Sequence, residues 1–427
     1  MLSKDRKAAY KLPPAIAGPS ESQELRRRKA LDEQKRKRAQ RVDSTRQLDL
    51  FADLNLGRSD DEDGADDSEV VRAGISPYAS LLPSSSATPQ APEAAMEAVA
   101  QGKKKRKSKL RKGHNKWADR CMYAELLEMN EENCWDMSES GADGLPEDLE
   151  TAWVAVGPVP LGKRCLAVTD QSLGVPGLVP NTSLRSRKLG KLLMPRFPSC
   201  LPASTVLDCI LDARWKENGI LHILDVLKWK GQDIAECETP FRFWWRDTRL
   251  GELAPSPPPS SSSYNELSDF TDSTIALPRV YSFPYPTKFL AVPYHSDTSL
   301  PTLVSHIIPS ARASRLVDVD IPADNGAEPD QSMAVDQSSS NIFTTRSSEI
   351  GSDGLLLYVS EATYESGTSP LSSWIPLVKY GEDAPSSAMT ESQPSESPLD
   401  IFLRLVQKRI GQRSDGAYNT GWITMDV

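Results

Sequence analysis

The basic segment at residues 24–46 constrains the folding of this chain more than any other stretch. It carries ten Lys and Arg residues against four acidic ones in 23 residues, although the whole chain has a net charge of -9. An acidic stretch follows at residues 60–69. A cluster this basic is not required for the folding of an otherwise acidic protein, so it indicates a binding partner.

The same region predicts one long helix over residues 23–52. It contains neither Gly nor Pro and consists largely of good helix formers. Its apolar residues are few and scattered, so the helix is polar nearly all round and has no core of its own. We therefore expect it to be loose in isolation and to become ordered only against an acidic surface.

Proline, glycine and serine divide the rest of the chain into one folded domain and several segments without a core. The chain holds 33 Pro and 24 Gly among 427 residues, and segments rich in them bury too little apolar surface to fold. We expect disorder at residues 1–22, at 53–112 with a second basic cluster at 103–112, and at 381–427 with a short helix near 399–410.

The folded domain is predicted over residues 113–380, with disordered insertions at 254–276 and 323–350. Helix-like patterns occur at residues 117–129 and 299–308. Short apolar, strand-like runs occur at residues 152–156, 165–168, 205–213, 219–229, 287–292, 354–360 and 374–378. Many short strands with few helices predict an α+β fold built on antiparallel sheets.

The cysteines and the hydropathy exclude several classes of protein. Six Cys residues stand at irregular spacings without a CxxC pair or a His cluster, so we expect reduced thiols, no metal site and no cofactor. No apolar run is long enough to span a bilayer, so we expect no membrane partner.

Three stretches of the domain resemble one protein family. They are residues 206–250, the GKR turn at 162–164, and residues 353–374. Together they resemble the snurportin family, the import adaptors for small nuclear RNPs that carry a trimethylguanosine cap. The resemblance implies a fold similar to the nucleotide-binding domain of mRNA guanylyltransferases, without their catalytic activity. It also implies that the basic helix is an importin-β-binding domain.

The enzymatic alternative is a guanylyltransferase-like nucleotidyltransferase acting on RNA caps. Such an enzyme needs a lysine nucleophile in a KxDG sequence to form a covalent guanylate. No KxDG occurs in this chain, and Gly141 and Gly351 stand in the lysine's place in GADG and GSDG. The sequence therefore predicts a binding protein and not an enzyme.

The resemblance also implies which residues surround the base of the cap. Trp374, at the end of the GTSPL-x-x-W run, matches the tryptophan on which the family stacks the charged base. Tyr123, Ala124 and Leu126 match a Leu, a Ser and a Trp that line the base in the family. Tyr123 would add a second aromatic face. Leu126 stands where the family has a Trp, so the sequence does not decide whether the site distinguishes a trimethylated from a monomethylated cap.

Cations are expected around the triphosphate of the cap. Arg164 matches the arginine of the family's GKR turn, and a guanidinium binds phosphate oxygens in a fork that lysine does not reproduce. Lys163 lies next to it. The loop at residues 183–188 offers Arg185, Arg187 and Lys188 in the region where the family uses a lysine.

The basic helix allows three interpretations: an RNA-binding arm, a plain nuclear localisation signal, or an importin-β-binding helix. RNA-binding arms usually contain aromatic residues or Gly, and residues 24–46 have none. The length of the helix favours importin-β. The residues expected to contact it are Arg26, Arg27, Arg28, Lys29, Lys35, Arg36, Lys37, Arg38 and Arg41.

A candidate export signal lies at the end of the same segment. Leu48, Phe51, Leu54 and Leu56 have the spacing of a leucine-rich signal, although this spacing also arises by chance. Family members place their export contact nearer the N-terminus, where this chain has only Leu2 and Leu12 as leucines. We expect an exportin as a further partner, and a protein that shuttles between nucleus and cytoplasm.

Overall fold

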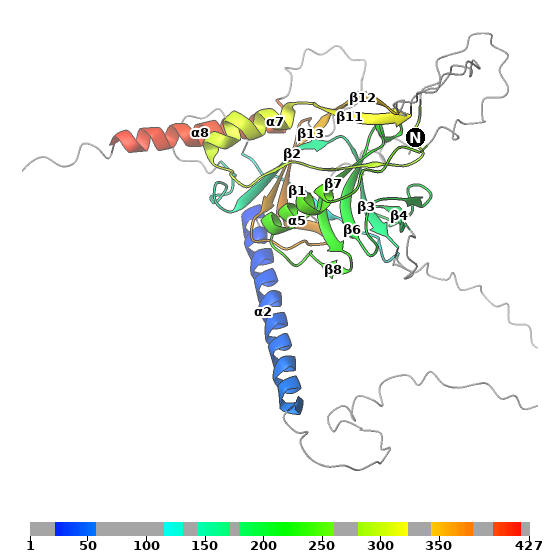
Figure 1. Cartoon of the computed structure of the whole chain (residues 1–427). Helices are drawn as coiled ribbons and strands as arrows, with labels where there is room; N and C mark the ends of the chain where they lie inside the picture. Colours follow the sequence, from blue (N-terminus) through cyan, green and yellow to red (C-terminus); the bar gives the residue numbers. More distant parts are fainter. Residues whose placement is uncertain are drawn as a thin grey trace, which may run out of the picture. The chain divides into compact units, whose positions relative to one another are not determined.

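The computed structural model has a mixed α+β fold with a long N-terminal helix, α2 (Gln23–Leu56) (Figure 1). The structure describes residues 22–56, 115–130, 143–170, 179–259, 281–322, 343–378 and 396–419. The described residues up to 38 and from 115 onward pack as one compact unit, and residues 39–56 lie outside it. The prediction of an α+β fold with antiparallel sheets is confirmed.

The first sheet has five strands in the order β1-β14-β13-β2-β10. Their bounds are Met122–Leu126 for β1, Trp153–Pro160 for β2, Tyr294–His295 for β10, Ser352–Val359 for β13 and Gly367–Pro376 for β14. All neighbours pair antiparallel except β1, which pairs parallel with β14. Strands β2 and β13 read as nearly continuous apolar runs because they are buried on both faces.

The second, larger sheet has seven strands, of which six follow the order β5-β4-β3-β6-β7-β8 and β9 pairs parallel with β7. Their bounds are Gly162–Thr169 for β3, Asn181–Ser186 for β4, Phe197–Pro198 for β5, Val206–Asp212 for β6, Ile220–Trp229 for β7, Gln232–Asp233 for β8 and Lys288–Ala291 for β9. Only Leu161 separates β2 from β3, so the chain crosses directly from one sheet to the other.

Helix α5 (Thr239–Gly251) joins the two sheets through a buried ion pair. Arg242 pairs with Asp225 of β7 at 3.0 Å, and neither side chain has any exposed surface. The same guanidinium donates to the carbonyl oxygen of Ala362, just after β13, at 2.9 Å. Because Arg242 bonds to residues of both sheets, it fixes how one sheet meets the other.

Two further helical segments pack against the first sheet. Residues 300–312 form one helical run of α6 (Leu300–Thr302), η3 (Leu303–Ile307) and α7 (Ile308–Arg312), close to the predicted helix at 299–308. Helix α8 (Pro398–Asn419) is longer than the short helix expected near 399–410. It buries Phe402, Leu405 and Val406, and Arg409 donates to the carbonyl oxygens of Leu145 and Pro146. The short helix α4 (Trp215–Asn218) links β6 to β7.

Two sequence predictions are wrong in detail. Residues 117–129 were expected to form a helix, but they contain a turn and then β1, because the edge of β14 supplies hydrogen-bond partners that local propensity does not reveal. Residues 343–350 were expected within an insertion, but they form β12 (Phe343–Ile350), which pairs with β11 (Arg315–Pro322) in a separate two-stranded sheet.

Several other predictions fall outside the described residues. They concern residues 1–21, the linker from 57 with its basic cluster at 103–112, the insertion from 260 to 276, residues 323–342, and the tail at 381–395 and beyond 419. None of the helices in the described parts of the chain is both long and apolar enough to cross a membrane.

The pair of Arg242 and Asp225 provides a test of the fold. Replacing Asp225 by Asn leaves a buried guanidinium without its counter-charge, which typically costs about 3 to 5 kcal/mol. We expect Asp225→Asn to lower the free energy of unfolding by this amount in urea titrations followed by circular dichroism. Asp233→Asn is the matched control, since that carboxylate is 47% exposed. Equal stability of the two variants would contradict the assigned role.

Candidate ligand-binding site

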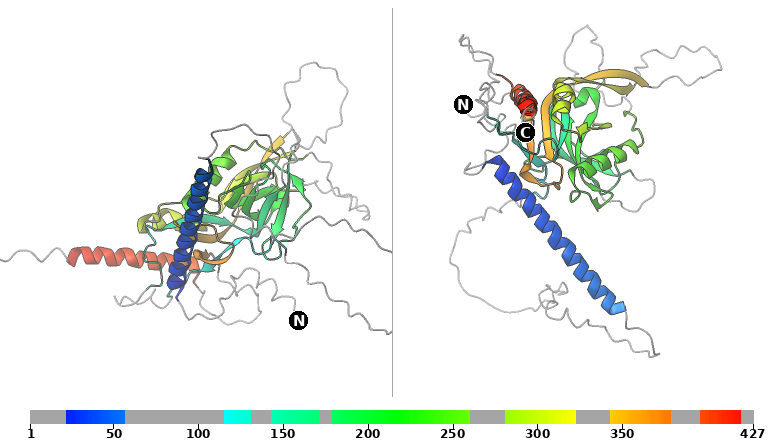
Figure 2. Two further views of the ribbon diagram at one scale, coloured as in Figure 1. Left: turned by 90° about the horizontal axis from the view of Figure 1, so that it is seen from below. Right: turned by 90° about the vertical axis from the view of Figure 1, so that its left-hand side faces the viewer.

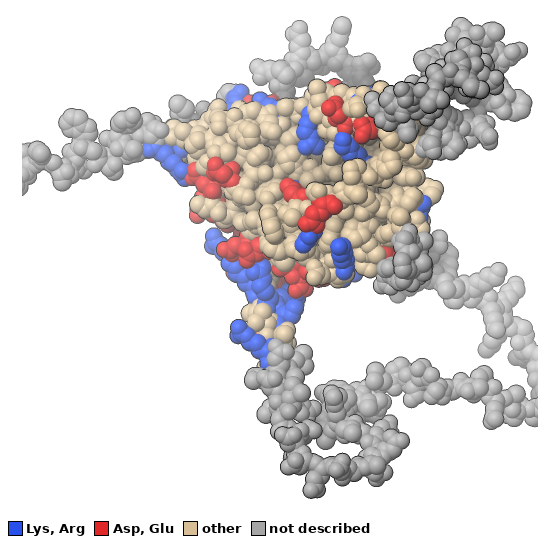
Figure 3. Space-filling view, in the orientation of Figure 1, with Lys and Arg blue, Asp and Glu red and all other residues tan. Residues whose placement is uncertain are grey.

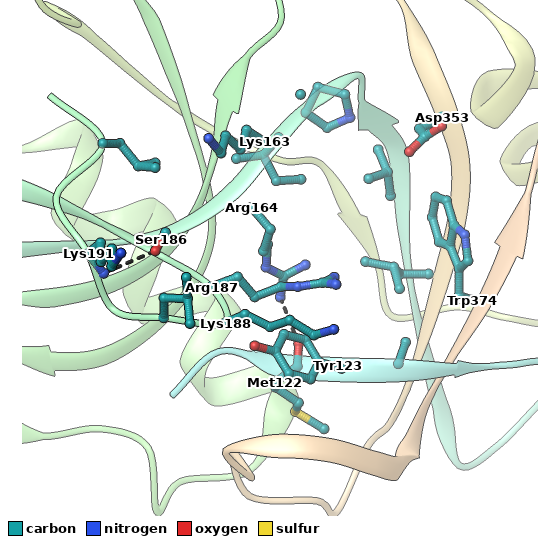
Figure 4. Close-up of a pocket in the computed structure, with 18 residues that line it drawn as sticks. Met122, Tyr123, Lys163, Arg164, Ser186, Arg187, Lys188, Lys191, Asp353 and Trp374 are labelled. Atoms are coloured by element: carbon teal, nitrogen blue, oxygen red, sulfur yellow. Dashed lines mark hydrogen bonds between the residues drawn. The ribbon is translucent and has the colours of Figure 1, made fainter. Parts of the chain in front are cut away.

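A cavity of about 570 Å³ lies where the two sheets meet (Figure 4). Its walls come from β1, β2, β13 and β14 of the first sheet, and from β3, β6 and the loop after β4 in the second. Apolar residues make up much of the wall: Met122, Ala124, Val159, Pro160, Leu189, Leu193, Ile210 and Leu356. Aromatic and charged residues complete it.

Gly162 allows β3 to enter this junction. A Cβ atom at this position would lie 2.3 Å from the carbonyl oxygen of Leu211 on β6, a distance that no side chain tolerates. The glycine of the GKR turn is therefore needed for the close approach of the two strands. Lys163 and Arg164 follow directly and line the cavity.

Arg164 lines the cavity with its guanidinium held by Asp208 of β6. Nε donates to Oδ1 at 2.6 Å and Nη2 donates to Oδ2 at 2.8 Å, a bidentate pair in which the carboxylate is fully buried. Nη2 also donates to the carbonyl oxygen of Met122 at 3.2 Å. The hydroxyl of Tyr364 donates to Asp208 at 2.6 Å and accepts from the amide of Met122 at 2.8 Å. This network anchors the first residue of β1.

Trp374 forms part of the wall on the side of the first sheet. It is 8% exposed, and its carbonyl oxygen accepts a hydrogen bond from the amide of Leu127 at 3.0 Å. Leu126 lies opposite Trp374 in the register between β1 and β14, but it is 39% exposed and is absent from the cavity wall. Of the predicted base-contacting residues, the structure thus brings together Trp374, Tyr123 and Ala124.

The ring of Tyr123 is already covered on one side. The guanidinium carbon of Arg187 lies 4.5 Å from the centroid of the Tyr123 ring. The hydroxyl of Tyr123 donates a long hydrogen bond to Asp119 at 3.4 Å. Burial raises the pKa of Tyr123 well above its usual range, so the phenol stays neutral at physiological pH. Burial likewise raises the pKa of the Cys165 thiol, on the neighbouring strand β3, to about 12, so this cysteine is an inert core residue.

A tight turn after β4 presents cations to the cavity. The amide of Gly190 donates to the carbonyl oxygen of Ser186 at 2.8 Å, and Gly190 has a φ of +60°, which favours glycine. Arg187 and Lys188 line the cavity from this turn, as predicted from the sequence, together with Lys191, which the sequence analysis missed. Arg185 was predicted too, but it precedes the turn and is not part of the wall.

Asp353 is the second charged residue of the wall that the sequence did not reveal. It is the only carboxylate in the cavity wall formed by the described residues. Figure 4 shows Asp353 and Trp374 together on one side, and Lys163, Arg187, Lys188 and Lys191 toward the other. The Asp-Gly pair at 353–354 was considered only as part of a missing KxDG sequence. The cavity is therefore polarised, with one aromatic and acidic end and one basic end.

The other predicted transport residues are not part of the cavity wall. The nine cations expected to contact a receptor are on α2. The candidate export signal, Leu48, Phe51, Leu54 and Leu56, is on the same helix, but the side chains of these four residues lie outside the described part of the structure. Within the described residues, no three His, Cys, Asp or Glu side chains gather closely enough to hold a metal ion.

Two models of one protein family match this chain. The model described as "Snurportin1, m3G cap-binding domain" matches residues 137–271, and the model described as "Snurportin1" matches residues 6–47. The first match contains β2, β3 and the basic turn, including Lys163, Arg164, Arg187, Lys188 and Lys191. The second contains the basic part of α2. Tyr123, Asp353 and Trp374 lie outside both matched ranges.

Proposed function

This chain belongs to the snurportin family, and we propose that it is a non-catalytic nuclear import adaptor. It binds the trimethylguanosine cap of spliceosomal small nuclear RNAs and links the RNP to importin-β. The observation that carries the proposal is the polarised cavity between the two sheets. A methylated cap has matching polarity, since its base is a cation and its triphosphate is an anion.

The base of the cap occupies the end of the cavity that holds Trp374 and Asp353. A cationic purine stacks on an indole with a cation-π contribution that grows as water is excluded. The carboxylate of Asp353 supplies the counter-charge that such a base needs away from bulk water. Val159 and Leu356 in the same wall are apolar and accept methyl groups without demanding a hydrogen-bond donor.

The triphosphate occupies the basic end. Lys163, Lys188 and Lys191 provide point charges, and Arg187 provides a planar fork. Arg164 was expected to bind phosphate oxygens, and it also has a structural role. Its bidentate pair with Asp208 fixes the orientation of the guanidinium at the cavity wall, and its bond to the carbonyl oxygen of Met122 holds the start of β1.

The enzymatic alternative has one observation in its favour, because Lys163 lies in the cavity wall. However, the sequence Lys163–Arg164–Cys165–Leu166 is not the KxDG of a guanylyltransferase, because Cys165 and Leu166 stand in place of Asp and Gly. A covalent lysine-guanylate formed on incubation with GTP and a divalent metal ion would favour the enzyme. An unmodified mass after the same incubation favours the adaptor.

The transport partners are assigned to α2. Arg28, Lys29, Arg36, Lys37 and Arg41 are exposed on this helix and present charge to importin-β, an acidic receptor. The leucine-rich residues at the end of the helix are the proposed contact for an exportin, which returns the protein from nucleus to cytoplasm. Loss of nuclear export in a Leu54→Ala, Leu56→Ala double variant would support this contact.

Trp374 is the first residue to test. Stacking of a base on an aromatic side chain contributes about 1 to 3 kcal/mol, so Trp374→Ala should weaken binding of a trimethylguanosine cap analogue about 5- to 150-fold in fluorescence titrations. Trp374→Phe keeps an aromatic face and should lose less. Trp244→Ala is the matched control, because Trp244 is 52% exposed on α5 and is absent from the cavity wall. Unchanged affinity in Trp374→Ala, with an unchanged circular dichroism spectrum, would refute the stacking role.

Asp353 tests the polarity of the cavity. Asp353→Asn keeps the shape of the side chain but removes its charge, so binding of N7-methylated caps, whose base is cationic, should weaken about tenfold, or about 1.4 kcal/mol. Binding of the unmethylated cap analogue, whose base is neutral, should change less. Asp233→Asn is the control. An equal loss for both caps would mean that Asp353 acts through structure and not through charge.

A further inference from the structure

The N-terminal part of α2 lies against the domain along one face. Residues 23, 27, 31, 34 and 38 are buried or half-buried, whereas residues 39–47 are all exposed. Spacings of three and four place these five residues on one side of a helix. The right-hand view of Figure 2 shows the first turns of the helix, in dark blue, against the domain. The sequence showed no such face, because the buried positions are mostly polar.

The first turn is anchored to the end of β1. The side chain of Gln23 donates to the carbonyl oxygen of Leu126 at 2.9 Å and accepts from the amide of Glu128 at 3.1 Å. Arg26 pairs with Glu125 at 2.9 Å and with Glu128 at 3.0 Å. Gln23 is 3% exposed and Glu125 is 5% exposed, so their contacts are largely shielded from water, whereas the Glu128 side chain is 52% exposed.

The next turns add packing contacts. The guanidinium of Arg27 is 5% exposed and lies 4.5 Å from the centroid of the Trp153 ring. Ala30 and Leu31 pack against the hydrophobic core of the domain. Farther along, Gln34 accepts from the amide of Thr363 at 2.9 Å. The helix is therefore held by side chains that fit the domain, and not by charge alone.

Four carboxylates of the domain face this helix. Besides Glu125 and Glu128, Glu361 pairs with Lys35 at 2.7 Å and Glu238 pairs with Arg38 at 3.2 Å. We call Glu125, Glu128, Glu238 and Glu361 the acidic strip. In Figure 3 acidic side chains gather where the basic helix meets the domain. They come from three separate parts of the sequence, so only the fold assembles the strip.

We infer that the acidic strip is a docking surface for the basic helix of the same chain, and that importin-β must displace it to bind residues 23–38. The inference rests on the proposed function for the identity of the receptor. A receptor that encloses a basic helix needs the face that the domain already covers. On this face Arg26 and Arg38 pair with the strip, and Arg27 lies against Trp153. The two bound states therefore exclude each other over these residues.

The contacts between the helix and the strip are weak enough to form and break reversibly. The Lys35 and Glu361 side chains are 54% and 56% exposed. Those of Arg38 and Glu238 are 42% and 54% exposed. Ion pairs this exposed to water contribute little to stability. Beyond Arg38 the described side chains of the helix are exposed, so a receptor can begin binding there while residues 23–38 are still docked. Docking lowers the apparent affinity for the receptor in proportion to the fraction of undocked protein.

Removing charge from the strip tests the inference without altering the helix. In the full chain, Glu125→Gln with Glu128→Gln should raise the affinity for importin-β about 3- to 10-fold in a titration, because less of the protein is docked. Amide hydrogen exchange in residues 23–38 should become faster. Glu217→Gln with Glu252→Gln is the control, since both carboxylates are exposed and neither contacts α2.

A second variant is needed as a safeguard against misfolding, because Glu125 is buried. Glu238→Gln with Glu361→Gln changes only exposed carboxylates and should shift affinity and exchange in the same direction, by a smaller factor. Equal importin-β affinity in wild type and both strip variants would overturn the competition. Absence of importin-β binding in every form would overturn the proposed function and the competition together, while exchange in residues 23–38 would still report whether the helix is docked.

Discussion

The bidentate ion pair between Arg164 and Asp208 is the interaction on which the site depends. It joins β3 to β6 within the second sheet, and the same guanidinium donates to the carbonyl oxygen of Met122 at the start of β1. Tyr364, from the loop after β13, completes the network by bonding to both Asp208 and Met122. A buried pair persists only when its remaining hydrogen-bonding groups are satisfied. Here they are satisfied by the first sheet, so the pair also sets where the two sheets meet.

The polarity of the cavity follows from this junction. Its acidic and aromatic end comes from β13 and β14, and its basic end comes from β3 and the turn after β4. Neither sheet alone presents both charges to the cavity. The strand that closes the cavity, β1, also carries Glu125 at its far side, where the basic helix docks. The cavity and the docked part of α2 thus both contact one short strand, β1.

The strands most accurately predicted from the sequence are those buried on both faces. The runs at 205–213 and 219–229 became β6 and β7, because burial on both faces leaves a continuous apolar run that is visible locally. Strand β1 was mistaken for a helix, and β12 was mistaken for disorder. Strand β1 is held chiefly by hydrogen bonds to the distant strand β14, and β12 by bonds to β11, which precedes it by twenty residues. Such pairing leaves little trace in local composition. Lys191 and Asp353 were missed for the same reason, since only the fold brings them to one cavity.

The sequence by itself determined the basic helix, its lack of a core and its need for an acidic surface, because these follow from residue types over a short range. It also pointed to Trp374, although through a family resemblance and not through local chemistry. Only the tertiary structure decided where the acidic surface lies. Glu125, Glu238 and Glu361 are separated by more than a hundred residues along the chain and meet beside one helix. A surface assembled from such distant residues depends on the packing of the two sheets, which no local pattern encodes.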